Sequence, residues 1–133
     1  MSNMLKNKIL QRCIKEAREN ITLAQFRCKH FSFLVRKSHI VSVGINHQYK
    51  THPLAAKYGH RFSSIHSEIH ALSNWKYGTE DCILLNIRLD KWGNLRYSEP
   101  CQYCKRFLDD IGLSYMFSTE NGFIERKNEQ VGL

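Results

Sequence analysis

The sequence predicts an α/β protein of the layered-sandwich class. Segments with the apolar spacing of helices alternate with short apolar runs typical of strands, in the order α-β-β-α-β-α-β-β. The chain has 133 residues, which suits one domain with a single hydrophobic core. No repeat and no Pro- or Gly-rich linker interrupts it, so we expect residues 1–133 to form a single domain.

The first half of the chain supplies one helix, two strands and a long loop. Residues 5–19 carry an apolar residue at every fourth position, which predicts an amphipathic helix. Residues 31–35 and 40–44 are short strand-like runs, and the polar residues 36–39 between them suit a hairpin turn. Residues 44–62 form a polar loop rich in Lys and His, and loops of this length are usually functional.

The second half supplies two helices and three strands. Residues 65–76 have one apolar face and predict a helix, with Ser63 or Ser64 as its N-cap. Residues 82–89, CILLNIRL, look like a buried strand.

A third helix is predicted to start with Pro100 at its first position, where the missing N–H costs nothing, and to run to Gly112. Residues 114–118 and 123–127 follow as two strands. The Asn-Gly dipeptide between them is typical of a hairpin, so the last two strands should be antiparallel.

The composition bears on compartment and partners. The formal net charge of +8 favours partners that carry phosphate, from nucleotides to nucleic acids, although a solvated basic surface would give the same charge. The chain has no long apolar run and its first residues do not resemble a signal peptide, so we expect no membrane span and a cytoplasmic location. Five cysteines, an odd number, argue against a secreted disulfide framework. We interpret Cys13, Cys28 and Cys82 as buried small hydrophobic residues.

Two short motifs carry the donor groups of a metal site. The stretch HSE, residues 66–68, lies near the predicted start of one helix, and PCQYC, residues 100–104, lies at the start of another. Cys101 and Cys104 are three positions apart on one helix face, and the positive end of the helix dipole favours the thiolate that binds metal. If the two helix starts face each other, one nitrogen and two sulfurs converge. Three protein ligands and an open fourth position are typical of catalytic zinc.

The pattern H-x-E followed by P-C-x-x-C resembles the zinc signature of the cytidine/deoxycytidylate deaminase superfamily, which includes tRNA adenosine and nucleic-acid deaminases. The predicted order of elements resembles that fold over nearly the whole chain. The resemblance implies a three-layer α/β/α sandwich with a mixed five-stranded sheet. It also implies one Zn²⁺ per chain, held by His66, Cys101 and Cys104.

The resemblance further implies roles in a hydrolytic deamination. Zinc would lower the pKa of a water molecule that attacks C4 of cytosine or C6 of adenine. Glu68 would be the catalytic residue that carries a proton from this water to the ring nitrogen and then to the departing ammonia. Asn46 would contact the sugar, and the backbone N–H groups of Ser67 and Cys101 would contact the base. The family usually has alanine where Ser67 stands.

We expect the substrate to be a free (deoxy)cytidine nucleotide, most of all deoxycytidylate, with Lys50 and His52 as candidate phosphate contacts. The loop that holds them resembles that of small deaminases encoded by phages, which would place the protein in a host cytoplasm. The alternative is cytosine or adenine in single-stranded DNA or RNA, which the net charge of +8 favours. The family often forms oligomers, so we also expect a homo-oligomer.

The subfamily cues conflict. The Glu-Pro-Cys stretch resembles tRNA adenosine deaminases, whereas antiparallel final strands resemble the free cytidine deaminases and the toxin-type deaminases. Trp75, Tyr77 and Trp92 would be able to stack on a base, but we interpret them as core residues.

Three other interpretations of the motifs remain. A structural zinc site would need a fourth ligand, for which His70 is the nearest candidate. A thioredoxin-like redox role for the two cysteines would leave His66 and Glu68 unexplained. A non-catalytic zinc-binding module would not need Glu68.

Overall fold

Short segments of helix and strand follow one another in the order that the sequence predicts. The structure is a computed structural model that describes residues 4–21, 29–48 and 64–128. The elements are α1 (Asn7–Glu19), β1 (Lys29–Arg36), β2 (His39–Ile45), β3 (His47–Gln48), β4 (Ser64–Ile65), α3 (Ser67–Ser73), β5 (Cys82–Leu89), β6 (Leu95–Arg96), α4 (Gln102–Asp110), β7 (Ser114–Thr119) and β8 (Gly122–Arg126).

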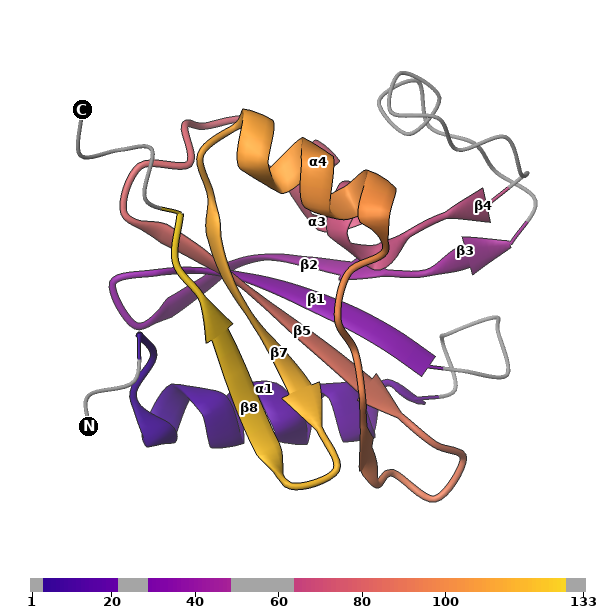
Figure 1. Cartoon of the computed structure of the whole chain (residues 1–133). Coiled ribbons are helices and arrows are strands. Elements are labelled where there is room, and N and C mark those ends of the chain that lie inside the picture. Colours follow the sequence, from indigo (N-terminus) through magenta and orange to yellow (C-terminus); the bar gives the residue numbers. More distant parts are fainter. Residues whose placement is uncertain (1–3, 22–28, 49–63, 129–133) are drawn as a thin grey trace.

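The main sheet has the strand order β2-β1-β5-β7-β8, with β6 paired to the end of β5. Helix α1 covers one face, and α3 and α4 cover the other, which confirms the predicted three-layer sandwich (Figure 1). β1 is antiparallel to β2 and β5, β5 is parallel to β7, and β7 is antiparallel to β8. The sheet is therefore mixed, as predicted, but it has six strands where the sequence predicted five.

Both predicted hairpins form. Lys37 and Ser38 join β1 to β2 with φ of 48° and 69°, as a two-residue type I′ loop requires. At the second hairpin Thr119 pairs with Gly122, so its loop is Glu120-Asn121. The glycine of the Asn-Gly signal thus begins β8, at φ 142°, and the predicted antiparallel arrangement of the last two strands is confirmed.

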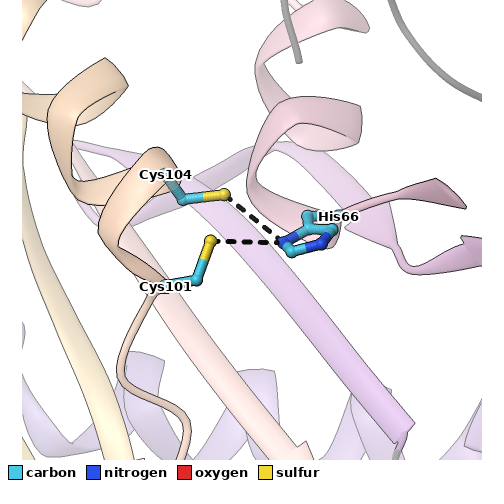
Figure 2. Close-up of side chains that lie close together, drawn as sticks. All are labelled: His66, Cys101 and Cys104. Atoms are coloured by element: carbon cyan, nitrogen blue, oxygen red, sulfur yellow. Dashed lines mark hydrogen bonds between the residues drawn. The ribbon is translucent and has the colours of Figure 1, made fainter. Parts of the chain in front are cut away.

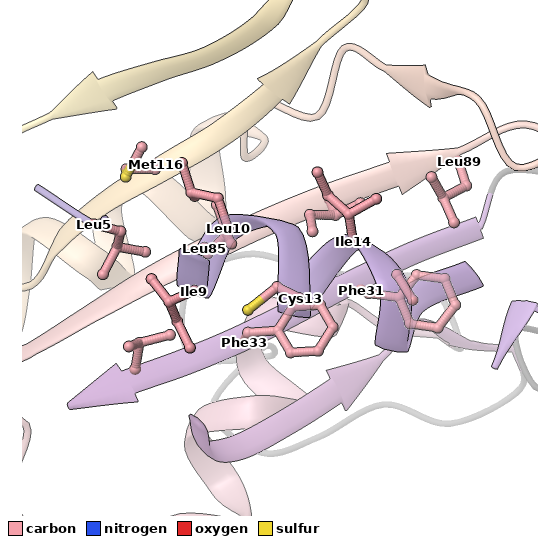
Figure 3. Close-up of a cluster of buried hydrophobic side chains, with 13 residues drawn as sticks. Leu5, Ile9, Leu10, Cys13, Ile14, Phe31, Phe33, Leu85, Leu89 and Met116 are labelled. Atoms are coloured by element: carbon pink, nitrogen blue, oxygen red, sulfur yellow. The ribbon is translucent and has the colours of Figure 1, made fainter. Parts of the chain in front are cut away.

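The apolar stripe of α1 packs on one face of the sheet and forms the larger part of the core (Figure 3). Because successive side chains of a strand point to opposite faces, alternate residues of β1 and β5 meet the helix. The buried residues of this cluster on α1 and the strands include Ile9, Leu10, Cys13, Ile14, Phe31, Phe33, Leu85, Ile87, Leu89 and Met116. Burial of a large apolar side chain is worth about 1.5–3 kcal/mol, so this face is the main source of stability.

The opposite face of β1 and β5 changes character along the strands. The cross-strand pairs on this face, taken in order toward the start of β1, are Leu34–Leu84, Ser32–Asn86 and His30–Arg88. The first pair is fully buried and apolar, the second is buried and polar, and the third is half-buried. The apolar core under α3 and α4 therefore gives way to polar side chains within one sheet face.

Both helices of the predicted metal site start later than expected. α3 starts at Ser67 with His66 as its N-cap, so the prediction of Ser63 or Ser64 as the cap is wrong. The reason is β4, which pairs with β3 and keeps the backbone extended up to the N-cap. α4 starts at Gln102 with Cys101 as its N-cap, so Pro100 lies before the helix and not in its first turn.

Several single-residue expectations have clear outcomes. Cys13 and Cys82 are buried, as predicted, whereas Cys28 lies outside the described residues. Tyr77 and Trp92 are exposed, at 72% and 73%, so their interpretation as core residues is wrong. Both lie in connections rather than on the apolar face of an element. In the part of the chain that the structure describes, no helix is long and apolar enough to cross a membrane.

Gly44 allows α3 to approach β2 closely. A Cβ atom at this position would lie 2.1 Å from the Ser67 carbonyl oxygen and 2.3 Å from the Ala71 nitrogen, both backbone atoms. Two hydrogen bonds join β2 to α3 on either side of the glycine. The Ser42 hydroxyl donates to the Ala71 carbonyl at 2.6 Å, and the Ile45 N–H donates to His70 Nδ1 at 2.9 Å.

We expect Gly44→Ala to lower the free energy of unfolding by about 3 kcal/mol, because α3 would have to move off the sheet. Urea denaturation, monitored by circular dichroism, measures this change in free energy. Gly78→Ala is the matched control, since a Cβ at Gly78 meets no atom within 4 Å. Equal midpoints for the two variants would contradict the close packing of α3 on β2.

Candidate active site

The candidate site forms where the N-caps of α3 and α4 face each other. His66 and Cys101 have the extended backbone of N-cap residues, with ψ of 150° and 167°. Each carbonyl nevertheless accepts the first bond of its helix, from His70 N–H at 3.0 Å and from Lys105 N–H at 2.9 Å. The two side chains are therefore fixed at the helix starts and point toward one another (Figure 2).

Three metal donors converge at this point. His66 Nδ1 lies 3.7 Å from Cys101 Sγ and 3.5 Å from Cys104 Sγ, and all the donor atoms lie within 4.8 Å of one another. A tetrahedral zinc ion, with Zn–N of about 2.0–2.1 Å and Zn–S of about 2.3 Å, separates nitrogen from sulfur by about 3.6 Å. The two nitrogen–sulfur distances therefore fit a tetrahedral metal ion.

The protonation of the two thiols also favours a cation at this place. The Cys104 thiol and the His66 imidazole hydrogen-bond to Cys101 and lower the pKa of its thiol to about 3, although burial opposes the shift. The hydrogen bond to Cys101 and burial raise the pKa of the Cys104 thiol. The hydrogen bond with Cys101 raises the pKa of His66. The pair thus shares one proton, and a divalent cation would replace that proton and stabilise both thiolates.

Glu68 lies beside the three donors but is held by other groups. Its side chain is only 4% exposed, and Oε1 accepts hydrogen bonds from Asn86 Nδ2 at 2.9 Å and Ser67 Oγ at 3.1 Å. It also interacts with the Cys104 thiol and contributes to the raised pKa of that group. A buried carboxylate next to a metal-donor cluster is suited to proton transfer.

Of the predicted sugar and phosphate contacts, the structure describes Asn46 but not Lys50 or His52. Asn46 follows β2 and is buried; its Oδ1 accepts the His30 N–H and its own N–H donates to the His30 carbonyl, both at 3.3 Å. Burial lowers the pKa of the His30 imidazole, and the charge of Glu68 opposes this shift, so Asn46 neighbours a residue near the site. Lys50 and His52 lie outside the described residues and stay predictions.

Ser67 is buried, and its hydroxyl contacts Glu68 and Ser32. The side chain thus belongs to the network around Glu68. A contact of its backbone N–H with the base stays a prediction.

His70 is not part of the donor cluster. Its Nδ1 accepts the Ile45 N–H at 2.9 Å, which ties the end of β2 to α3. Among the described residues, the cluster of possible metal donors comprises His66, Cys101 and Cys104 alone. Three donors without a fourth favour the open catalytic geometry over the structural zinc site.

The segment that leads to Cys101 is fixed by polar contacts. The Ser98 hydroxyl donates to the Asn86 carbonyl at 3.0 Å and lies 2.8 Å from Ser118 Oγ. Just beyond it the Glu99 carboxylate pairs with Lys105, in the second turn of α4, and this pairing lowers the pKa of Glu99. These contacts set the position at which the cysteine motif begins.

Ser32 and Asn86 contribute to the site and were missed by the sequence analysis. Each lies in a strand that otherwise reads as an apolar run, FSFLV for Ser32 and CILLNIRL for Asn86. A polar residue within a buried strand must find a hydrogen-bond partner, so this break in the apolar pattern was the available signal.

Comparison with known proteins places the fold. No family model matches the chain, and no curated protein matches its sequence. Solved structures do match. The deoxycytidylate (dCMP) deaminase of cyanophage S-TIM5 aligns with a TM-score of 0.57 and 17% identity, over 85% of this chain and 86% of that one. The same enzyme in complex with dCMP and dUMP gives 0.58 and 16%, over 85% and 82%.

The cytidine deaminase of Mycobacterium leprae aligns with a TM-score of 0.52 and 18% identity, over 84% of this chain and 88% of that one. The alignments cover most of each chain, so the similarity includes the whole sandwich. The chain therefore has the cytidine-deaminase fold, as its motifs indicated.

We expect His66→Ala to abolish the binding of zinc, whereas His70→Ala should keep about one equivalent per chain. The second variant instead leaves the Ile45 N–H unsatisfied, which costs about 1–3 kcal/mol of folding stability. Metal analysis of the purified proteins, together with urea denaturation, measures both effects. Loss of zinc from His70→Ala with the fold intact would favour the four-ligand structural site.

Proposed function

We propose that this chain, which has the fold of the cytidine and deoxycytidylate deaminases, is a zinc-dependent hydrolytic deaminase of cytosine in a free (deoxy)cytidine nucleotide, most of all deoxycytidylate. The observation that carries the proposal is the group His66, Cys101 and Cys104, spaced for a tetrahedral metal ion, with the buried Glu68 carboxylate beside it. The fold alone admits many activities, whereas this arrangement of donors and carboxylate supports one kind of chemistry.

His66, Cys101 and Cys104 would hold the zinc ion. When bound there, zinc would lower the pKa of a water molecule toward about 7 and so supply a nucleophile at neutral pH. Glu68, which is not among the donors, would accept a proton from the attacking water. It would then deliver that proton to the ring nitrogen and assist the departure of ammonia. Its burial excludes bulk water, which would compete for the proton.

The substrate side rests on fewer observations. Asn46 would contact the sugar, since it lies at the end of β2 beside His30. Lys50 and His52 would contact the phosphate, and the backbone N–H groups of Ser67 and Cys101 would contact the base. The similarity to the phage enzyme, whose structure contains dCMP and dUMP, supports a mononucleotide. We also propose a cytoplasmic location and a homo-oligomer, as the resemblance to the family implies.

A second candidate substrate is a cytosine or adenine in single-stranded nucleic acid. The net charge of +8 favours it, and two exposed aromatic rings give a possible stacking surface. Trp92, with Lys91 Nζ 4.4 Å from its ring centroid, is 73% exposed, and Tyr97 is 52% exposed. Both residues lie between β5 and α4, on the connection that leads to the cysteine motif.

We expect Glu68→Gln to lower kcat by about 10²–10⁴-fold while the zinc content stays the same, because the amide cannot carry the proton. Ammonia release from dCMP measures the activity. Glu80→Gln, a change at an exposed carboxylate remote from the donor cluster in sequence, is the matched control. Full activity of Glu68→Gln would remove this residue from the mechanism and favour the non-catalytic zinc-binding module.

The substrate class is tested by ammonia release from dCMP, cytidine and single-stranded oligonucleotides that contain C or A. We expect turnover on the mononucleotide and weak oligonucleotide binding. Turnover on oligonucleotides alone, with an affinity that falls steeply as salt rises, would instead assign the basic surface to nucleic acid, because neutralised phosphates release counterions.

A further inference from the structure

Asn86 joins the Glu68 carboxylate to the segment that precedes the cysteine motif. It lies in β5 and is 2% exposed. Its Nδ2 donates to Glu68 Oε1 at 2.9 Å and to the Ser98 carbonyl at 3.3 Å. The amide is thus in contact with the one carboxylate that the proposed reaction needs.

The environment of Asn86 fixes the orientation of its amide. The carboxylate of Glu68 and the carbonyl of Ser98 accept hydrogen bonds and have no hydrogen to give, so the NH₂ group must face them. On its other side, Asn86 Oδ1 lies 2.5 Å from the Ser32 hydroxyl, which donates to it. A flipped amide would place Oδ1 against two oxygens that have no hydrogen to give, so the bonds to Glu68 and Ser98 would both be lost.

Ser32 also closes the network. Its Oγ lies 2.8 Å from Ser67 Oγ, which in turn lies 3.1 Å from Glu68 Oε1. A ring of contacts therefore runs from Glu68 through Asn86, Ser32 and Ser67 back to Glu68. Each hydroxyl has one hydrogen: Ser32 donates its own to Asn86 Oδ1, and Ser67 donates its own either to Glu68 Oε1 or to Ser32 Oγ. Asn86 Nδ2 is therefore the constant donor to Oε1, while the carboxylate keeps its contact with the Cys104 thiol.

The position of this polar pair is costly unless it serves the carboxylate. Ser32 and Asn86 are direct cross-strand partners, and the next pair on the same face is Leu34–Leu84, which is fully buried and apolar. An apolar pair would continue that core, whereas each buried polar group costs about 1–3 kcal/mol if its hydrogen bond is missing. The bonds to Glu68 and Ser67 account for both polar side chains.

We propose that Asn86 is a positioning residue of the active site: its amide, which Ser32 anchors from the other side, holds the Glu68 carboxylate in the place from which it transfers protons. This inference rests on the proposed function, since it assigns Asn86 a part in the same reaction. Without the amide, Glu68 Oε1 would lose a buried donor and the side chain would turn to another partner. Misplacement of a catalytic group by about 1 Å costs about 10²-fold in rate.

The test compares Asn86→Ala, which removes the donor, with Ser32→Ala, which keeps the donor but removes the hydrogen bond that anchors Asn86 Oδ1. Ser114→Ala is the matched control, because Ser114 is a partly buried hydroxyl residue in β7, the strand beside β5, and its hydroxyl accepts the Asn128 N–H at 2.9 Å, away from Glu68 and the cysteine motif. For each protein, kcat, KM for dCMP, zinc content and a crystal structure are determined.

We expect Asn86→Ala to lower kcat by about 10²-fold, with KM and zinc content unchanged and the Glu68 carboxylate displaced in the crystal structure. Ser32→Ala should show the same pattern to a smaller extent, and it carries the test if Asn86→Ala does not fold. Ser114→Ala should keep the kcat of the unmodified chain.

Two outcomes would overturn the proposal. One is a Glu68 carboxylate that stays in place with unchanged kcat, and the other is equal losses of kcat and zinc in the Asn86 and Ser114 variants, which would mark a merely structural role. Absence of turnover in the unmodified chain would be a failure of the proposed function instead. The crystal structures would then still decide whether Asn86 holds the carboxylate.

Discussion

The antiparallel pairing of β1 with β5, in the register that places Ser32 opposite Asn86, is the constraint on which the rest of the structure depends. Alternate residues of these two central strands point to opposite faces of the sheet. One face therefore presents Phe31, Phe33 and their partners to α1, while the other presents a polar pair beneath the candidate site. A register shift of one residue would exchange the two faces and remove both the core and the network around Glu68.

The buried polar network is stable because its groups satisfy one another. Among the described residues, the network comprises the buried residues Ser32, Ser67, Glu68, Asn86, Ser98 and Ser118, whereas the buried Ser42 and Asn46 bond to backbone groups elsewhere. Within the described residues, no buried side-chain nitrogen or oxygen lacks a hydrogen-bond partner. A network of this kind fixes the orientation of its members, since a change at one group leaves another unsatisfied. Because each buried polar group depends on its hydrogen-bond partner, the network costs free energy when one bond is missing. The same dependence makes the network suitable for holding a carboxylate in one place.

The donor cluster depends on a different device, the use of N-cap residues as ligands. His66 and Cys101 both precede a helix with extended backbone, so their side chains leave the helix axis and meet. Cys104 lies in the first turn of α4 and is fully buried. The close contact of α3 with β2 at Gly44 sets where His66 lies, and the contacts of Ser98 and Glu99 set where the cysteine motif begins.

The sequence by itself determined the order of the longer helices and strands and the two hairpins, and it predicted the three candidate metal donors. These depend on local features: apolar spacing, turn residues and motif spacing, all of which act over a few positions. It also indicated a buried strand at 82–89 but gave no role to the asparagine within it. The cues for helix starts at Ser63 or Ser64 and at Pro100 were misleading, since the strand pair β3–β4 and the approach to the cysteine motif override local capping preferences.

Only the tertiary structure decided which side chains meet. The short strands β3, β4 and β6 each contain two residues and exist only through pairing with another strand, so their own residues carry no periodic signal. The contacts of Ser32 with Asn86 and of Asn86 with Glu68 span 54 and 18 residues, and only the register of the sheet and the packing of α3 create them. His70 lies four positions from His66, within reach of the same helix face, yet it binds the end of β2 instead. Motif spacing gives the donors, but the long-range hydrogen bonds that hold the carboxylate follow from packing alone.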